Sequence, residues 1–385
     1  MDIAFLTTSL ARGGAETQLV RIATTLARRG WQVGILTMFP SELRPEEVER
    51  GGIPWVEYPG RLSRVPLRLA CHLTRQLRQW RPQVLVTFNY PADVVGRICG
   101  RLAGVPRIIS GLRTAQRQPP FRERFYRYTE PLITLTVSNS QAALDAMAAR
   151  KTLTLSKTAM IHNGLILGEY PAALGREQAR SRLGLPDNRF LWLAVGNLRP
   201  AKDYPTLLEA AAQCLSQRPD FKLIIVGDGP DRDELERRST ALALMETVEF
   251  LGSRADVPEI LRAADAYVLS SAWEGSPNTL MEAMASNLPA VATDVGDVRD
   301  LVERAGAGYV VPPRDPRRLA EGMLALMSQK PDLRQEMGAK GRDLIMREFE
   351  NDRVVDIWEA LLRRVASGLV PVGPGQPPPT PFDQR

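Results

Sequence analysis

Cysteine is scarce in this chain of 385 residues, which has only Cys71, Cys99 and Cys214. Zinc sites and disulfide frameworks need cysteines in paired or closely spaced patterns, and these three are far apart. The spacing argues against a structural zinc site and against a disulfide-stapled fold, and it suits a reducing compartment. We expect the three thiols to have no chemical role.

Long apolar runs are also missing. A helix that crosses a bilayer needs about 18 or more successive apolar residues. No stretch approaches this length, although 44% of the residues are hydrophobic. The start of the chain, MDIAFLTTSLARGG, lacks the charged beginning, long apolar centre and cleavage site of a secretory signal. We therefore expect a soluble, cytoplasmic protein.

Acidic residues are nearly absent between residues 61 and 127. This range holds fourteen arginines and no lysine against two acids, Asp93 and Glu123, so its net charge is +12, whereas the whole chain carries +6. Such a region favours an anionic partner, although arginines that only solvate helix faces would give the same charge. Some arginines recur near helical spacing beside apolar residues, which predicts a face that lies on the inner leaflet of a membrane. They are Arg61, Arg64, Arg68, Arg75 and Arg78, beside Leu62, Val65, Leu69 and Leu73.

Short apolar segments, with room for a helix between them, recur along most of the chain. In the first half they are residues 3–6, 33–36, 84–87, 107–110 and 132–137. In the second half they are residues 190–195, 221–226, 248–251, 266–269, 289–292 and 309–311. Strands that alternate with helices form parallel sheets covered on both faces. The sequence therefore predicts an α/β protein with two doubly wound domains.

Turn-forming residues separate the two series of strands. We expect a first Rossmann-like domain over residues 1–165, a linker over 166–186 and a second Rossmann-like domain over 187–350. A helix with one apolar face is expected at 351–366, and the proline-rich residues 367–385 are expected to be disordered.

The most informative segment is SSAWEGSPNTLMEAMASNLPAVAT, residues 270–293. A strand is expected to end at its first two serines, a turn carries Glu274, and a helix runs on through Glu282. Free amides at such a helix N-terminus, beyond the carboxyl end of a parallel strand, bind phosphate groups. Glu282 lies a little over two helical turns further on, where it can accept hydrogen bonds from both hydroxyls of a ribose. The same spacing also fits a capping Glu followed by an exposed helical Glu.

Two further segments point to phosphate chemistry. In VGNLRPAKDYPTLLEA, residues 195–210, a strand ends near Gly196, and Lys202 at the next helix start can neutralise a leaving diphosphate. Gly13 and Gly14 follow the first strand, where glycine lets backbone amides approach a diphosphate. The full Gly-x-Gly-x-x-Gly fingerprint of dinucleotide-binding proteins is absent, which disfavours a nicotinamide enzyme.

The sequence EGSPNTLMEAMA, residues 274–285, resembles the Glu-x7-Glu signature of family 4 retaining glycosyltransferases. Other elements of that family recur in the same order between residues 1 and 366. They are Gly13-Gly14-Ala15-Glu16, Asn163-Gly164, Val195-Gly196, Lys202, Val226-Gly227-Asp228-Gly229-Pro230 and Leu251-Gly252-Ser253. The resemblance implies the GT-B fold, two facing Rossmann-like doubly wound parallel-sheet domains with a central cleft. It further implies that residues 1–165 bind the acceptor and residues 187–350 bind the nucleotide-sugar donor.

By this resemblance, Glu274 orients hydroxyls of the donor sugar, and Glu282 holds the nucleotide ribose. Lys202 and an arginine stabilise the leaving diphosphate. The arginine usually follows the glycine directly, but Asn197 stands there, so this role is assigned to Arg199. The other expected donor-binding residues are Gly13, Gly14, Gly196, Arg254, Gly275, Ser276, Pro277, Asn278 and Thr279.

A second departure concerns the N-terminal domain, where many members carry a His near the acceptor hydroxyl. This chain reads RIISGLRTAQ there, residues 107–116. Arg113 is therefore the candidate at this place for contact with the acceptor or with donor phosphates. The two histidines of the chain, His72 and His162, are expected to be structural.

The string Asp231-x-Asp233 is similar to the metal clamp of the other large transferase fold. It sits, however, in the acidic first turn of an expected helix. We therefore expect no metal and no cofactor.

The activity that the resemblance implies is metal-independent transfer of a hexose-type sugar from a UDP- or GDP-sugar to an acceptor hydroxyl, with retained configuration. The expected acceptor is a lipid-linked or polysaccharide intermediate of bacterial surface-glycan synthesis. Peripheral contact with an anionic membrane is expected, and a nucleic acid partner is not. A nucleotide-sugar epimerase of the same fold and a catalytically silent sugar-nucleotide-binding subunit remain alternatives.

Overall fold

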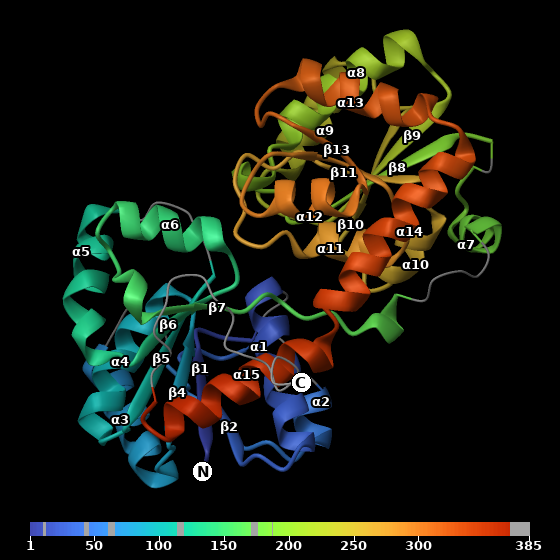
Figure 1. Cartoon of the computed structure of the whole chain (residues 1–385). Coiled ribbons are helices and arrows are strands. Elements are labelled where there is room, and N and C mark those ends of the chain that lie inside the picture. The colour runs from blue at the N-terminus through green and yellow to red at the C-terminus, as the bar shows by residue number, and fades with distance from the viewer. Residues whose placement is uncertain are drawn as a thin grey trace. The chain divides into compact units, whose positions relative to one another are not determined.

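The computed structural model describes residues 1–10, 13–41, 46–60, 66–113, 119–170, 176–186 and 188–369. The chain divides into two compact units, each with its own sheet (Figure 1). Unit 1 comprises Met1–Gly164 and the described residues from Asn351 onward, whereas unit 2 comprises Leu165–Glu350.

Unit 1 is built on a seven-stranded parallel sheet of order β3-β2-β1-β4-β5-β6-β7. Its strands are β1 (Ile3–Thr7), β2 (Val33–Thr37), β3 (Trp55–Glu57), β4 (Val84–Phe88), β5 (Arg107–Leu112), β6 (Leu135–Ser138) and β7 (Thr158–Met160). Its α-helices are α1 (Gly14–Arg28), α2 (Glu46–Arg50), α3 (Pro66–Trp80), α4 (Tyr90–Ala103), α5 (Pro120–Thr129), α6 (Gln141–Ala149) and α15 (Asn351–Ala366).

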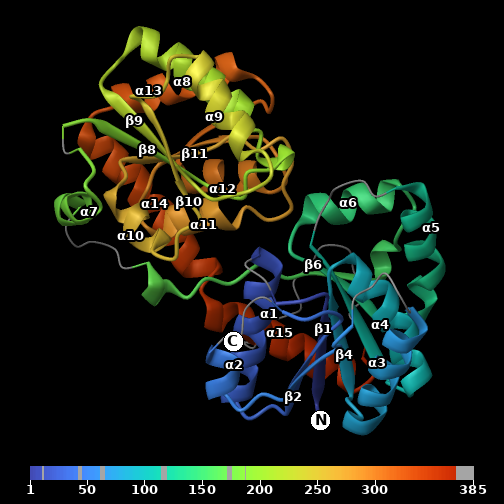
Figure 2. The same cartoon turned by 180° about the vertical axis from the view of Figure 1, so that it is seen from behind.

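Helices cover both faces of this sheet because successive strand residues point to opposite sides. Ile3 and Phe5 of β1 pack with α1 and α15, whereas Ala4 and Leu6 pack with α3 and α4. The strand registers are regular: Ile3 of β1 lies opposite Val33 of β2 and Val84 of β4. The two layers of helices can be followed in the front and back views (Figures 1 and 2).

Unit 2 has a six-stranded parallel sheet of order β10-β9-β8-β11-β12-β13. Its strands are β8 (Phe190–Val195), β9 (Phe221–Val226), β10 (Val248–Gly252), β11 (Ala266–Leu269), β12 (Ala290–Thr293) and β13 (Gly308–Val311). Its α-helices are α7 (Arg176–Leu183), α8 (Tyr204–Gln217), α9 (Arg232–Ala241), α10 (Val257–Ala263), α11 (Asn278–Ala285), α12 (Val298–Ala305), α13 (Pro316–Ser328) and α14 (Pro331–Glu348). The two parallel-sheet domains predicted from the sequence are thus confirmed.

Two strands fall outside the expected segments. β3 and β7 have three residues each and lie at the two edges of the unit 1 sheet. Edge strands this short carry no apolar run that periodicity can detect.

The segment 166–186, expected as a linker, packs against unit 2 where the structure describes it. Ala179 of α7 and Leu185 belong to the unit 2 core. The buried Arg180 guanidinium forms an ion pair with Asp265 at 2.6 Å. This segment is therefore part of unit 2. The expected disordered tail lies outside the described residues from residue 370 onward.

Helix α3 contains part of the arginine-rich face that the sequence placed on a membrane. Its Leu69 and Leu73 are buried in the core against the sheet, so they cannot enter a lipid surface. The expectation that these leucines lie on a membrane is wrong, because the sheet needs them as cover. Arg68, Arg75 and Arg78 are exposed. The other expected members, Arg61, Leu62, Arg64 and Val65, lie outside the described residues.

Helix α15 returns the chain to unit 1 after unit 2 is complete. Its apolar face joins the unit 1 core beside α1, and Trp358 stacks on Phe88 of β4 with ring centroids 6.5 Å apart. The chain therefore passes between the units twice, after Gly164 and after Glu350.

Candidate active site

The sheet of unit 2 has a topological switch point between β8 and β11. From β8 the chain proceeds outward through β9 to β10, and from β11 it proceeds the other way through β12 to β13. The loops that leave the carboxyl ends of β8 and β11 therefore diverge, and ligands of open α/β sheets bind in the crevice between such loops. Both motifs that the sequence singled out lie on these two loops.

The loop after β8 brings Lys202 back over the strand end. Gly196 permits this approach, because a Cβ there would lie 2.9 Å from Cε of Lys202 and 3.2 Å from the Tyr204 hydroxyl. The Tyr204 hydroxyl donates a hydrogen bond to the Gly196 carbonyl at 3.1 Å. Pro200–Lys202 form a 3-10 turn, and Asp203, with φ of 47°, redirects the chain into α8. The backbone of this loop therefore holds the Cα atom of Lys202 beside the end of β8.

The loop after β11 supplies the partner of Lys202. The Lys202 Nζ atom lies 2.6 Å from Oε1 of Glu274, and the Ser271 hydroxyl donates to the same oxygen at 2.7 Å. The Ser270 hydroxyl donates to the Lys202 carbonyl at 2.8 Å, and the amide of Ala272 donates to the Ala201 carbonyl at 2.9 Å. The side chains of Lys202 and Glu274 are 20% and 12% exposed, so the pair is accessible to a ligand.

Helix α11 begins directly after this loop. The turn Gly275–Pro277 precedes Asn278, its first residue, and the first turn of any helix has amides without partners inside the helix. The Tyr267 hydroxyl of β11 lies within hydrogen-bonding distance of the Thr279 hydroxyl, at 2.8 Å, and of the Val195 carbonyl of β8, at 3.3 Å. This bridge holds the start of α11 beside the end of β8.

Glu282 lies one turn after the start of α11 and is half-buried. Burial raises the pKa of the Tyr267 hydroxyl, and the charges of Glu282 and Glu274 raise it further. The charges of both carboxylates thus act on the same tyrosine, and the assignment of Glu282 to the ribose stays a prediction.

The structure brings some predicted donor-site residues together and leaves others apart. The residues that surround the switch point are Gly196, Lys202, Glu274, residues 275–279 and Glu282. Arg199 is exposed on the same loop as Lys202, and its guanidinium makes no ion pair within the described part of the chain. Arg254 follows β10, the edge strand, and pairs bidentately with Asp256 at 2.8 and 2.5 Å. Its role as a donor contact stays a prediction.

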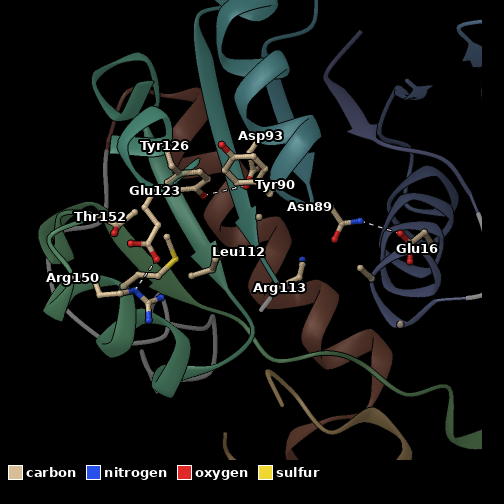
Figure 3. Close-up of a pocket in the computed structure, with 14 residues that line it drawn as sticks. Glu16, Asn89, Tyr90, Asp93, Leu112, Arg113, Glu123, Tyr126, Arg150 and Thr152 are labelled. Carbon is tan, nitrogen blue, oxygen red and sulfur yellow. Dashed lines mark hydrogen bonds and ion pairs between the residues drawn. The ribbon is translucent and has the colours of Figure 1, made fainter. Parts of the chain in front are cut away.

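Unit 1 has its own switch point, between β1 and β4. Gly13 precedes α1 there as its N-cap, and Gly14 is the first residue of that helix. Asn89, after β4, donates a hydrogen bond from Nδ2 to Glu16 Oε1 at 2.9 Å. Gly14, Glu16 and Asn89 border a cavity of about 260 Å³ (Figure 3). Roles for Gly13 and Gly14 in donor binding stay predictions.

Arg113 lies in this cavity and has unused hydrogen-bonding capacity. Its guanidinium stacks on Phe88, 4.1 Å from the ring centroid, and Nη1 donates to Asn163 Oδ1 at 3.2 Å. Nε and Nη2 are buried without a hydrogen-bond partner among the described residues. Burial lowers the pKa of Arg113 to about 10, while the Asp93 carboxylate opposes this shift. Arg113 therefore stays cationic at neutral pH and can bind an anionic group.

The other polar residues of the cavity were not predicted from the sequence. The buried Asp93 accepts hydrogen bonds from the Thr87 hydroxyl at 2.5 Å and the Tyr126 hydroxyl at 3.1 Å. Burial raises its pKa to about 6. Glu123 pairs with Arg150 at 3.2 Å (Figure 3). A signal was available, because Asp93 and Glu123 are the only acids between residues 61 and 127.

Other side chains bear on the metal and membrane expectations. Asp231 is the N-cap of α9 and Asp233 lies in its first turn. Within the described ranges, no group of three or more His, Cys, Asp or Glu side chains could hold a metal ion. The described helices also include none that combines the length and apolarity needed to cross a membrane.

Comparison with known proteins identifies the family. The model for Glycosyltransferase Family 4 matches residues 12–168, and the model for Glycosyl transferases group 1 matches residues 175–344. The UDP-Gal:alpha-D-GlcNAc-diphosphoundecaprenol alpha-1,3-galactosyltransferase of Escherichia coli is 28% identical over 254 residues, 62% of this chain and 65% of that protein. The N-acetyl-alpha-D-glucosaminyl L-malate synthase of Bacillus anthracis is 26% identical over 184 residues, 48% of each chain. The chain thus spans about half to two thirds of the length of these curated relatives.

Solved structures agree with the sequence matches over nearly the whole chain. The crystal structure of Anabaena HepE in complex with UDP has a TM-score of 0.81 and 25% sequence identity, covering 96% of this chain and 99% of that one. Its similarity extends over both parallel-sheet units. Together with the two family matches, it shows that this chain belongs to the family 4 glycosyltransferases, which have the GT-B fold.

Proposed function

We propose that this protein is a retaining glycosyltransferase that moves a hexose-type sugar from a UDP-sugar to an acceptor hydroxyl without a metal ion. The observation that carries the proposal is the Lys202–Glu274 pair at the switch point of unit 2, beside the N-terminus of α11. A cation and helix amides suit a diphosphate, and a carboxylate suits sugar hydroxyls. The UDP bound by Anabaena HepE supports uracil as the base.

The leaving diphosphate would be stabilised by positive groups of unit 2. Lys202 and the amides at the start of α11 supply this charge, and the exposed Arg199 adds a second cation from the same loop. Preorganised charge of this kind is often the largest single contribution to catalysis. Glu274 orients sugar hydroxyls and does not attack, because Lys202 and Ser271 already hold its Oε1. The acceptor oxygen bonds to the anomeric carbon as the bond to the phosphate oxygen breaks. The acceptor proton passes to that leaving oxygen on the same sugar face.

The acceptor would bind in the cavity of unit 1. The Nε and Nη2 atoms of Arg113, which have no hydrogen-bond partner among the described residues, suit a phosphate. The half-buried Tyr90, stacked on Tyr126 with ring centroids 5.9 Å apart, offers aromatic surface to a sugar ring. The E. coli relative is named for an acceptor linked to diphosphoundecaprenol. We therefore infer a lipid-linked intermediate of bacterial surface-glycan synthesis as acceptor, met by a cytoplasmic enzyme at the inner face of the membrane.

Product analysis tests the proposal. The purified protein is incubated with UDP-sugars, with and without lipid-linked acceptors, and UDP release and the anomeric configuration of the product are measured. A transferase releases UDP faster when acceptor is added, and the product keeps the donor configuration. An epimerase would change the sugar without acceptor, and a silent subunit would bind UDP without turnover.

Glu282→Ala is expected to weaken UDP binding by about 10- to 100-fold, because hydrogen bonds to a charged group contribute about 1.5–3 kcal/mol. Isothermal titration calorimetry with UDP measures the effect. Glu303→Ala serves as the control, since Glu303 is a half-exposed helical acid of α12 that pairs with Arg299. Equal UDP affinity of the Glu282 variant and the control would remove Glu282 from the ribose site.

Activity is expected to survive treatment with EDTA. Lys202, Arg199 and the α11 amides supply the positive charge that a metal supplies in metal-dependent transferases. The rate of UDP release is compared before and after EDTA, and again after addition of Mn²⁺. Complete loss with rescue by Mn²⁺ would contradict the proposal and would direct attention to Asp231 and Asp233.

A further inference from the structure

Helix α5 carries its aromatic residues on the solvent side. Phe121, Phe125 and Tyr128 recur at positions i, i+4 and i+7 and form one stripe along the helix. Their exposed fractions are 67%, 49% and 73%. A helix that only covers a sheet turns such a stripe inward. These exposed rings therefore need another explanation.

The opposite face of α5 is anchored, so the aromatic stripe cannot turn inward. Tyr126 is buried, with the Arg97 guanidinium 3.7 Å from its ring centroid. Nη1 of the buried Arg97 donates to the Tyr126 carbonyl at 2.8 Å and to the Thr129 hydroxyl at 2.9 Å. Glu123, also on the inner side, pairs with Arg150 (Figure 3). The outward position of the aromatic rings is thus built into the fold of unit 1.

Basic side chains flank the aromatic stripe. Arg124 and Arg127 are exposed, and Arg124 follows Phe121 by three residues and precedes Tyr128 by four. The only acid of α5, Glu123, lies on the inner side and is neutralised by Arg150. The outer face of α5 is therefore both aromatic and positively charged.

We propose that this outer face of α5 docks on an anionic membrane surface. Aromatic rings favour the boundary between headgroups and acyl chains, and arginines nearby attract anionic lipids. This docking proposal rests on the proposed function, because it names the surface that makes the inferred membrane contact. The α5 face takes the place of the α3 face that was expected from the sequence. Because the inner side of α5 lines the cavity of unit 1, an acceptor carried by lipid would enter beside the docking face.

Co-sedimentation with vesicles tests the docking surface. The full chain is mixed with vesicles of phosphatidylcholine alone, and with vesicles in which part of the lipid is phosphatidylglycerol. We expect binding to rise with the phosphatidylglycerol content. It should fall when salt is raised from roughly 0.15 M to 1 M, because the Debye length shortens from about 8 to 3 Å.

Variants separate the two components of the surface. Phe121→Ser, Phe125→Ser and Tyr128→Ser together are expected to abolish binding to both kinds of vesicle. Arg124→Gln with Arg127→Gln is expected to weaken binding to phosphatidylglycerol vesicles by about thirtyfold and to remove most of the salt dependence. Arg317→Gln with Arg347→Gln removes the same charge from exposed positions of unit 2 and should leave binding unchanged.

A further variant, Arg68→Gln with Arg75→Gln on α3, tests which of the two basic faces of unit 1 binds the vesicles. Docking by α5 is overturned if this pair abolishes binding while the α5 variants bind normally, or if binding does not depend on phosphatidylglycerol. It is also overturned if the chain forms dimers that the serine variant dissolves, without any vesicle binding. UDP affinity, measured without vesicles, reports separately on the donor site in unit 2, and circular dichroism with thermal unfolding confirms that each variant is folded.

Discussion

Lys202→Ala is expected to lower turnover by about 100- to 1,000-fold, the range seen when one preorganised donor to a developing oxyanion is removed. In the free enzyme the Lys202 ammonium lies 2.6 Å from Oε1 of Glu274 at the switch point of the sheet. Its contribution grows as charge builds on the leaving diphosphate, so the loss appears mainly in kcat. Steady-state kinetics with a UDP-sugar and acceptor measure it.

The Lys202→Ala variant is expected to lose much less folding stability than turnover. The pair is partly exposed, so its removal is expected to change the free energy of unfolding by about 1 kcal/mol or less. Lys222→Ala is a matched control, because Lys222 is 22% exposed and pairs with Glu249 at the same distance of 2.6 Å on neighbouring strands of the same sheet. Parallel losses of melting temperature and rate, or equal rates for the two variants, would make Lys202 a structural lysine.

Glu274→Gln is expected to lower turnover by about 100-fold while leaving UDP affinity unchanged or increased. The amide can still accept a hydrogen bond from Ser271, but it cannot pair with Lys202 or bind sugar hydroxyls as a charged acceptor. Free UDP lacks the sugar and loses no contact, whereas the released Lys202 becomes available to its phosphates. Calorimetry with UDP and kinetics with the UDP-sugar measure the two effects separately.

The control for this change is Glu249→Gln, which breaks the matched ion pair with Lys222 away from the switch point. It is expected to retain wild-type kinetics. A Glu274 variant that loses UDP affinity and turnover in equal proportion would contradict a role in holding the sugar.

The positions of the residues assigned to the donor could be predicted from the sequence because their signals are local, whereas their roles stay predictions. Lys202 and Glu274 each follow an apolar strand segment by a few residues, and such positions lie at the carboxyl edge of a parallel sheet. Their direct contact could not be predicted in the same way. It depends on β8 and β11 being neighbours, although β9 and β10 lie between them in the sequence. Strand order is a property of the whole sheet and has no local signature.

For the proposed acceptor site, the sequence indicates less about which residues take part. From the sequence, Asp93 and Glu123 could be recognised only as two negative charges in a basic region. The structure places both at one cavity, where burial and hydrogen bonding determine what each does. The sequence also does not show whether the leucines of α3 or the aromatic residues of α5 are exposed on the surface. Both helices have apolar stripes, and only the packing tells which stripe faces the sheet.

Helix α15 has a consequence for the order in which the protein folds as it is synthesised. Its Trp358, Leu361 and Val365 complete the core of unit 1, yet they follow all of unit 2 in the chain. While residues 165–350 are being made, the sheet face of unit 1 that α15 covers has no permanent cover. Unit 2 can therefore reach its final packing first, and unit 1, although it begins the chain, is the last to close.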